Sequence, residues 1–135
     1  MILLDSHTFV WLAGGDKRLG SEARRLIREA FRTDSLYLSP ISLWEISLKA
    51  SRGKIALDRP LRPWMNDALR LTRTRLVPIS PEIAIESAEL PEGFHGDPAD
   101  RIIASTARVS SLLLLTDDGK LLDLAKKGYF RAQRI

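Results

Sequence analysis

Acidic side chains follow two of the apolar runs that the sequence predicts as strands. Asp5 comes directly after the run at residues 2–4, and Asp117 and Asp118 come directly after the run that ends at Thr116. In open parallel sheets, ligands bind in the crevice beyond the carboxyl ends of the strands. Two acids that reach this crevice from separate strands are more informative than one. We therefore predict that Asp5 and Asp118 share a site, and we expect Asp117 to face solvent.

Glu45 lies inside an expected helix, among apolar residues. Ser42, three residues earlier, would allow a capping box in which the glutamate reaches back to the serine. Ser39–Pro40 is the better helix start, because serine caps the free backbone donors and proline fits the first helical position. Glu45 is then the sixth helical residue, too deep for capping. A carboxylate in an apolar stretch needs a partner or a metal, so we predict a site role for Glu45.

Asp97, Pro98 and Asp100 mark another helix start, and here two interpretations stay open. Asp97 is explained by capping alone. Asp100 is the third helical residue, where its charge favours the helix dipole by about 0.3–1 kcal/mol. From the same turn it can also point into the crevice beside Asp5. Arg101 is expected to pair with a carboxylate or to contact phosphate, with an ion pair favoured.

The types of these residues indicate the chemistry. The chain has no cysteine and only two histidines, so its carboxylate oxygens suit Mg²⁺ or Mn²⁺ better than zinc. Carboxylates drawn together repel one another until a divalent cation binds. Phosphodiester hydrolysis is the reaction that uses such a cluster, because bound metal polarises the phosphate and lowers the pKa of a water.

Short strands alternating with helices must position these acids. Proline follows a capping residue at three helix starts, Ser39, Ser80 and Asp97. The pattern predicts an α/β fold, with a central, mainly parallel sheet of four to five strands flanked by helices on both faces. Strands are expected at residues 2–4, 36–38, 76–79 and 112–115, with a weak one within 130–135. Helices are expected at residues 7–13, 21–33, 40–51, 61–72, 81–88, 99–109 and 119–127.

Length and composition narrow the class of protein. The 135 residues suit a single domain, residues 1–135, and the net charge of +4 favours polyanionic partners without establishing them. The first residues lack the basic leader of a signal peptide, and no apolar run approaches the roughly 20 residues that span a bilayer. Together with the absence of cysteine, these features lead us to expect a cytoplasmic protein without membrane contact.

Four segments together resemble the PIN-domain ribonucleases, and more narrowly the VapC-type toxins of type II toxin–antitoxin systems. The segments span residues 3–7 (LLDSH), 42–46 (SLWEI), 95–104 (HGDPADRIIA) and 115–118 (LTDD). The resemblance covers essentially the full chain. It implies a PIN-like fold and an endoribonuclease that uses Mg²⁺ or Mn²⁺. Its four acids would be Asp5, Glu45, Asp100 and Asp118, with the metal bound chiefly through Asp5 and Asp100.

The same resemblance implies supporting residues and partners. Ser6 matches a small hydroxyl residue that often follows the first acid, and Thr116 matches a hydroxyl that supports the fourth. The chain departs from the family's common pattern at His7, where asparagine is frequent, and at Ala99, where phenylalanine is frequent. Family members typically form homodimers, act on RNA and are silenced by a cognate antitoxin. We therefore expect a VapB-like antitoxin as a separate chain.

Other features have simpler explanations. The arginines at 24, 25, 28 and 32 fit a solvated helix face better than an RNA-binding track, and the three tryptophans fit a core or interface better than base stacking. His7 is close enough to Asp5 to reach substrate, although a structural role is the commoner one, and His95 is expected in a solvated loop.

Two alternatives to the nuclease are a receiver-like Mg²⁺-binding signalling domain and a catalytically inactive PIN-like binding module. A receiver-like domain needs adjacent acids after its first strand, whereas Asp5 lies between Leu4 and Ser6.

Overall fold

The computed structural model describes residues 1–94 and 96–135, so His95, expected in a solvated loop, lies outside the described residues. Five parallel strands form one sheet in the order β3-β2-β1-β4-β5. The strands are β1 (Ile2–Leu4), β2 (Leu36–Leu38), β3 (Arg75–Leu76), β4 (Leu113–Thr116) and β5 (Ala132–Arg134). The prediction of a mainly parallel sheet of four to five strands is confirmed.

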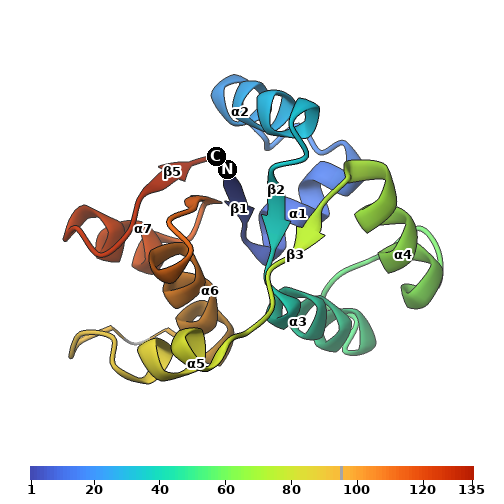
Figure 1. The fold of residues 1–135 in the computed structure, drawn as a ribbon. Coiled ribbons are helices and arrows are strands. Elements are labelled where there is room, and N and C mark those ends of the chain that lie inside the picture. Colours follow the sequence, from blue (N-terminus) through green and yellow to red (C-terminus); the bar gives the residue numbers. More distant parts are fainter. Residues whose placement is uncertain (95) are drawn as a thin grey trace.

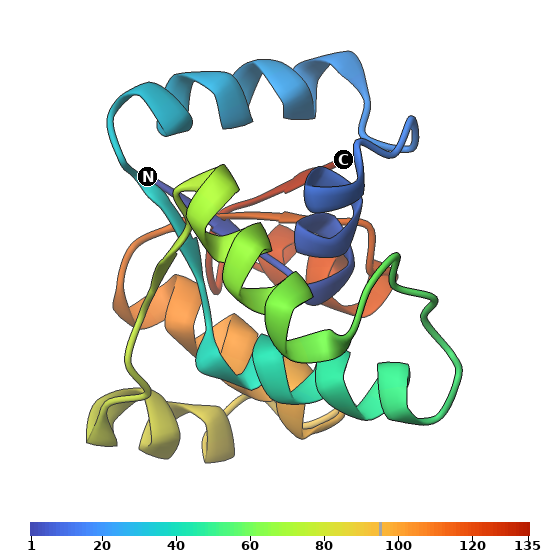
Figure 2. The ribbon, with the colours of Figure 1, turned by 90° about the vertical axis from the view of Figure 1, so that its right-hand side faces the viewer.

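Seven helices in the described part of the chain connect and cover these strands. They are α1 (Ser6–Gly14), α2 (Ser21–Arg32), α3 (Pro40–Ser51), α4 (Leu61–Thr72), α5 (Pro81–Ala88), α6 (Pro98–Val109) and α7 (Gly119–Lys126). The three proline-marked starts are confirmed, because Ser39, Ser80 and Asp97 each accept a backbone hydrogen bond at the N-cap. Figure 1 shows α1 and α4 on one side of the strands and α6 and α7 on the other. From the first side, α4 lies in front of the strands and α6 behind them (Figure 2).

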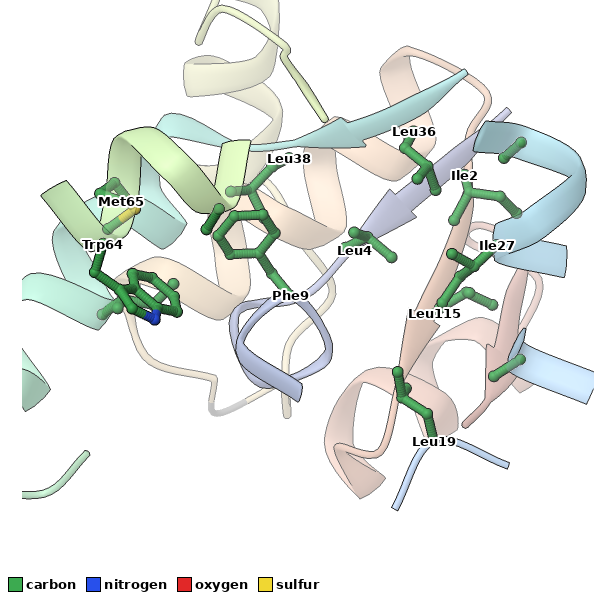
Figure 3. Packing of buried hydrophobic residues seen from close by; sticks show 14 residues of the cluster. Ile2, Leu4, Phe9, Leu19, Ile27, Leu36, Leu38, Trp64, Met65 and Leu115 are labelled. Carbon is green, nitrogen blue, oxygen red and sulfur yellow. The ribbon is translucent and has the colours of Figure 1, made fainter. Parts of the chain in front are cut away.

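The strands are apolar on both faces, and each face supports its own core. Successive side chains of a strand point to opposite faces. Ile2 and Leu4 therefore enter the cluster built with α1, α2 and α4, whereas Leu3 enters the cluster built with α6 and α7. Figure 3 shows the first cluster, in which the rings of Phe9 and Trp64 meet edge to face at 6.1 Å between centroids. This two-sided burial explains why the runs at β1 and β4 are continuously hydrophobic.

The register of the central strands brings together the chain positions that carry acids. Leu4 of β1 pairs with Leu38 of β2 and with Leu115 of β4. Since all three strands run in the same direction, the residues that follow them emerge at one edge of the sheet. Asp5 is thereby placed next to Thr116, and the N-terminus of α3 starts at the same edge, two residues after Leu38.

The third strand differs from the prediction. We expected a strand at residues 76–79, but β3 contains only Arg75 and Leu76. The Val77 amide still donates to the Leu38 carbonyl at 3.0 Å. Pro78 has no amide hydrogen and cannot continue a ladder, which is why the strand ends before it. The remaining strands and helices agree with the predicted ranges to within two residues at each end, apart from the terminal strand, which is shorter than the segment in which it was expected.

None of the helices that the structure describes combines the length and the apolar character needed to cross a membrane.

Phe9 provides a test of the first core cluster. Its side chain is fully buried against Trp64, so Phe9→Ala should lower the free energy of unfolding by about 3–5 kcal/mol. Leu71→Ala, at a side chain that is 62% exposed, should change it by less than about 0.5 kcal/mol. Urea denaturation of the metal-free proteins measures both values. Equal losses in the two variants would contradict this description of the core.

Candidate active site

A cavity of about 350 Å³ opens at the carboxyl ends of β1 and β4. Its walls come from α1, α3, the start of α6 and the turn between β4 and α7. All four predicted acids line it, together with two further aspartates: Asp5, Glu45, Asp97, Asp100, Asp117 and Asp118. The structure thus brings together residues that are separated by more than one hundred positions in the sequence.

Asp5 is the most deeply buried of these acids. Only 6% of the surface of Asp5 is exposed to solvent. One carboxylate oxygen, Oδ1, caps α1 by accepting a hydrogen bond from the Thr8 amide at 2.8 Å. Burial raises the pKa of the Asp5 carboxyl, and hydrogen bonds from Thr116 and Thr8 oppose that rise. A deeply buried carboxylate that faces a polar cavity is held ready for a cation, because a cation would offset the cost of its burial.

Thr116 connects the first acid to the fourth. Its hydroxyl donates to Oδ2 of Asp5 and accepts a hydrogen bond from the Asp118 amide at 3.0 Å. The resemblance implied that this hydroxyl supports the fourth acid. In the structure it contacts both acids at once, so the side chain of Asp5 and the backbone of Asp118 are positioned by a single fully buried threonine.

Asp118 and Asp117 have different surroundings. Asp118 is partly buried and caps α7, with Oδ1 accepting a hydrogen bond from the Leu121 amide at 3.0 Å. Asp117 is exposed and pairs with Arg134 on β5 at 3.0 Å. The expectation that Asp117 faces solvent is confirmed, although it also contributes to the rim of the cavity.

Asp97 and Asp100 share the first turn of α6. Asp97 is the N-cap and accepts a hydrogen bond from the Asp100 amide at 2.9 Å, as its capping interpretation predicted. Burial is the main reason why the pKa of Asp100 rises to about 7, and nearby negative charges add to it. Those charges are carried by Asp97, Asp118 and Glu45. The charges of the other acids therefore act on Asp100. A residue that only stabilised the helix dipole would not need to lie close to them.

Glu45 lies on α3 with its side chain only 13% exposed. Its Oε2 atom is 3.6 Å from Nζ of Lys49, one helical turn further along. This separation is longer than a hydrogen bond and describes a loose ion pair. Glu45 was expected near the other acids, and the structure places it there. Lys49 was not predicted, although its position four residues after Glu45 on one helix indicates that the two side chains can pair.

The donor set fits a hard divalent cation. All the acids offer oxygen atoms, and the charges of three neighbouring acids add to the rise that burial causes in the pKa of Asp100, which a divalent cation would oppose. Ser6 adds a buried hydroxyl on the cavity wall that has no hydrogen-bond partner among the described residues. Within the described residues, no three acidic or histidine side chains already meet in a geometry that would hold an ion.

Arg101 takes a role other than the ion pair that the sequence favoured. We expected it to pair with a carboxylate or to contact phosphate, with an ion pair favoured, but no carboxylate of the described residues lies within ion-pair distance of it, and contact with phosphate stays a prediction. Its guanidinium donates to the backbone carbonyls of Ser87 and Phe94, at 3.1 and 3.0 Å. It thus fastens the end of α5 and the segment before α6 to the helix that carries Asp100. Partners of this kind are set by tertiary packing and leave no signal in the local sequence.

Gly96 is a further positioning residue that the sequence analysis missed. A Cβ atom at this position would lie 2.6 Å from the Phe94 ring and 2.9 Å from Cβ of Asp100. Both distances are shorter than van der Waals contact. Only glycine therefore lets the segment before α6 approach Asp100 this closely.

Comparison with known proteins agrees with this geometry. The PIN domain family matches residues 2–127. Ribonuclease VapC22 of Mycobacterium tuberculosis is 36% identical to this chain over 120 residues, which cover 89% of the chain and 88% of that protein.

Solved structures show the same fold. The crystal structure of VapBC2 from Rickettsia felis, bound to a DNA fragment from its promoter, matches with a TM-score of 0.70 at 16% identity, over 99% of this chain and 98% of that one. DNA-bound VapBC from Salmonella typhimurium matches with a TM-score of 0.67 at 18% identity, over 98% and 96%. The family match and the relative both extend over most of the sequence, and the chain therefore belongs to the PIN domain family.

Proposed function

We propose that this protein is a metal-dependent endoribonuclease that hydrolyses RNA phosphodiester bonds and acts as the toxin of a type II toxin–antitoxin pair. The observation that carries the proposal is the convergence of Asp5, Glu45, Asp100 and Asp118 in one cavity. A PIN-family relative named as a ribonuclease supports it. Of the two alternatives, membership of the PIN family leaves no place for a receiver-like signalling domain. An assay of RNA cleavage in Mn²⁺ and in EDTA distinguishes the nuclease from the inactive PIN-like module.

Asp5, Glu45, Asp100 and Asp118 would hold Mg²⁺ or Mn²⁺, with Ser6 and Asp97 at the edge of the site. When bound there, a divalent cation polarises the phosphodiester and makes water a better nucleophile at neutral pH. The protein's own residues orient the ligands. Thr8 and Thr116 fix the Asp5 carboxylate, and Asp97 and the backbone of α6 fix Asp100. Since the pKa of Asp100 is raised to about 7, this carboxyl carries a proton below neutral pH, and a bound cation would favour its ionised form.

The proposed partners follow from the relatives. The structures of similar fold contain VapBC complexes, and a further one, from Klebsiella pneumoniae, is described as a toxin–antitoxin complex. We infer a VapB-like antitoxin that silences this chain, a homodimeric assembly, and RNA as the substrate. Action on cellular RNA would place the protein in the cytoplasm.

Cleavage of RNA should require the metal and Asp5. We expect purified protein to cleave structured RNA in Mn²⁺ and not in EDTA. Asp5→Asn should reduce the rate about hundredfold or more, because even the loss of a supporting hydrogen bond at a metal site costs about 10–100-fold. Asparagine caps helices as well as aspartate does, so α1 should be retained. Gel analysis of end-labelled RNA gives the rates.

Asp123→Asn, which removes the same charge from the exposed face of α7, is the matched control and should cleave at the wild-type rate. Equal cleavage by the Asp5 variant, or cleavage that survives EDTA, would refute the metal-dependent mechanism. Absence of cleavage by every form of the protein would favour the inactive binding module.

Metal binding should depend on pH through Asp100. Its pKa of about 7 means that the metal-free protein holds a proton there at lower pH, and the cation must displace this proton. Mn²⁺ affinity should therefore rise with pH, by up to about tenfold per unit below pH 7, and level off above it. Isothermal titration calorimetry between about pH 5.5 and 8 measures this dependence. Asp100→Asn should bind more weakly and with a shallower pH dependence; identical slopes would show that another group controls the binding.

Growth provides a cellular test. Induced expression in bacteria without the antitoxin should arrest growth, and Asp100→Asn should relieve the arrest at the same protein level. Asp123→Asn should remain as toxic as the wild type. Colony counts after induction, with protein levels checked by immunoblot, measure the effect. An undiminished growth defect in the Asp100 variant would argue that the toxicity arises elsewhere in the protein.

A further inference from the structure

The active-site cavity continues beyond the carboxylates along two helices. In α1, His7 and Trp11 are four residues apart, and in α3 Glu45 and Lys49 have the same spacing. All four side chains line the cavity. Residues at this spacing lie on one helix face about one turn, or 5.4 Å, apart. Trp11 and Lys49 therefore extend the site by one turn past the positions of His7 and Glu45.

Trp11 is held in place by the turn that follows α1. Gly15 adopts a left-handed conformation (φ 65°), and the Asp16 amide returns to the Trp11 carbonyl at 2.9 Å. The Asp16 carboxylate then accepts a bidentate pair of hydrogen bonds from the Arg18 guanidinium, at 2.7 and 3.1 Å. In this position the guanidinium lies 4.3 Å from the centre of the Trp11 ring. Arg18 thereby covers part of the Trp11 ring from outside the cavity, and the partly buried Trp11 side chain itself lines the cavity.

Lys49 supplies positive charge where the rest of the cavity is acidic. Of the described residues that line the cavity, it is the only one with a permanent positive charge. Its ammonium lies 3.6 Å from Glu45, too far for a hydrogen bond, so its donors stay available to a ligand. A polyanion that approaches six carboxylates needs such a group in addition to any metal.

We propose that Trp11 and Lys49 form a subsite for the nucleotide next to the scissile phosphate. An unpaired base stacks on the aromatic wall of Trp11, and a backbone phosphate of the same strand contacts the Lys49 ammonium. The inference rests on the proposed ribonuclease function and adds the two side chains that contact the nucleotide beside the scissile phosphate. Bases within a duplex stack on one another and are not free to stack on protein, so the subsite requires single-stranded RNA.

The stacking role is tested with a matched pair of RNAs. A short single-stranded RNA with a mapped cleavage site is compared with the same RNA in which one nucleotide beside the cut keeps its sugar and phosphate but has no base. The comparison is repeated for each nucleotide that neighbours the cut. At one position the wild type should lose about tenfold in kcat/KM when the base is missing. Trp11→Leu, which keeps an apolar side chain against the core, should cleave both RNAs equally, whereas Trp11→Phe should keep most of the preference.

The control for this test is Trp44→Leu, at a tryptophan of α3 that is 52% exposed and does not line the cavity. It should retain the full preference for the complete RNA. If Trp11 serves only to pack the core, Trp11→Leu will lower the cleavage rates of the two RNAs by the same factor and will keep the preference for the complete RNA. That result would overturn the stacking role. Should no RNA be cleaved by the wild type, the proposed function itself fails, which is a different outcome.

The role of Lys49 is tested by binding. In Ca²⁺, under conditions without cleavage, Lys49→Met should weaken binding of the same RNA about tenfold. It should also reduce the slope of log Kd against log salt by about 0.7, the value for one contact with a single strand. Lys54→Met, which removes an exposed charge just after α3, should leave the slope unchanged. Mn²⁺ affinity without RNA should be undiminished in Lys49→Met, because a positive charge has been removed. Weaker Mn²⁺ binding with an unchanged slope would mean that Lys49 only positions Glu45.

Discussion

The hydrogen bonds of the Thr116 hydroxyl, one to the Asp5 carboxylate and one from the Asp118 amide, connect the ends of β1 and β4 at the edge of the sheet where the acids gather. They form only because β1 and β4 are parallel neighbours in a register that places Leu4 opposite Leu115. A slip of one residue would turn Thr116 toward the other face of the sheet and separate the two acids. Both strands are buried on both faces by the two core clusters, and this burial holds the register.

The same edge gathers more negative charge than it can balance internally. Helices α3 and α6 bring Glu45 and Asp100 toward Asp5 and Asp118, and the pKa of Asp100 is raised by its burial and, in addition, by the charges of neighbouring acids. The folded core supplies the stability that keeps these like charges together, since each acid sits on an element anchored by buried apolar residues. Bringing these acids together therefore costs stability, and the divalent cation proposed for this site would offset that cost when bound.

Much of the fold and three of the four acids were predictable from local patterns. Proline after a capping residue marked the starts of α3, α5 and α6, and continuous apolar runs marked β1 and β4. Asp5 and Asp118 followed from their positions after those strands. Asp100 was predicted with less support, because capping and dipole effects explained its position nearly as well. Lys49, Gly96 and the carbonyl contacts of Arg101 were not predicted, because each depends on what approaches from another element.

By itself, the sequence determined most of the elements and the fold class, and it indicated Asp5, Glu45 and Asp118 as site residues, because capping, hydrophobic periodicity and strand-end placement are local properties of the chain. Asp100 joined them only through the resemblance to PIN-domain ribonucleases. Only the tertiary structure decided that Thr116 contacts two acids, that Arg101 binds carbonyls, and that Trp11 and Lys49 line the acidic cavity. The physical reason is distance along the chain. Hydrogen bonds and like-charge repulsion act over a few ångströms, and residues as far apart as Asp5 and Thr116 meet at that range only after the parallel strands have paired.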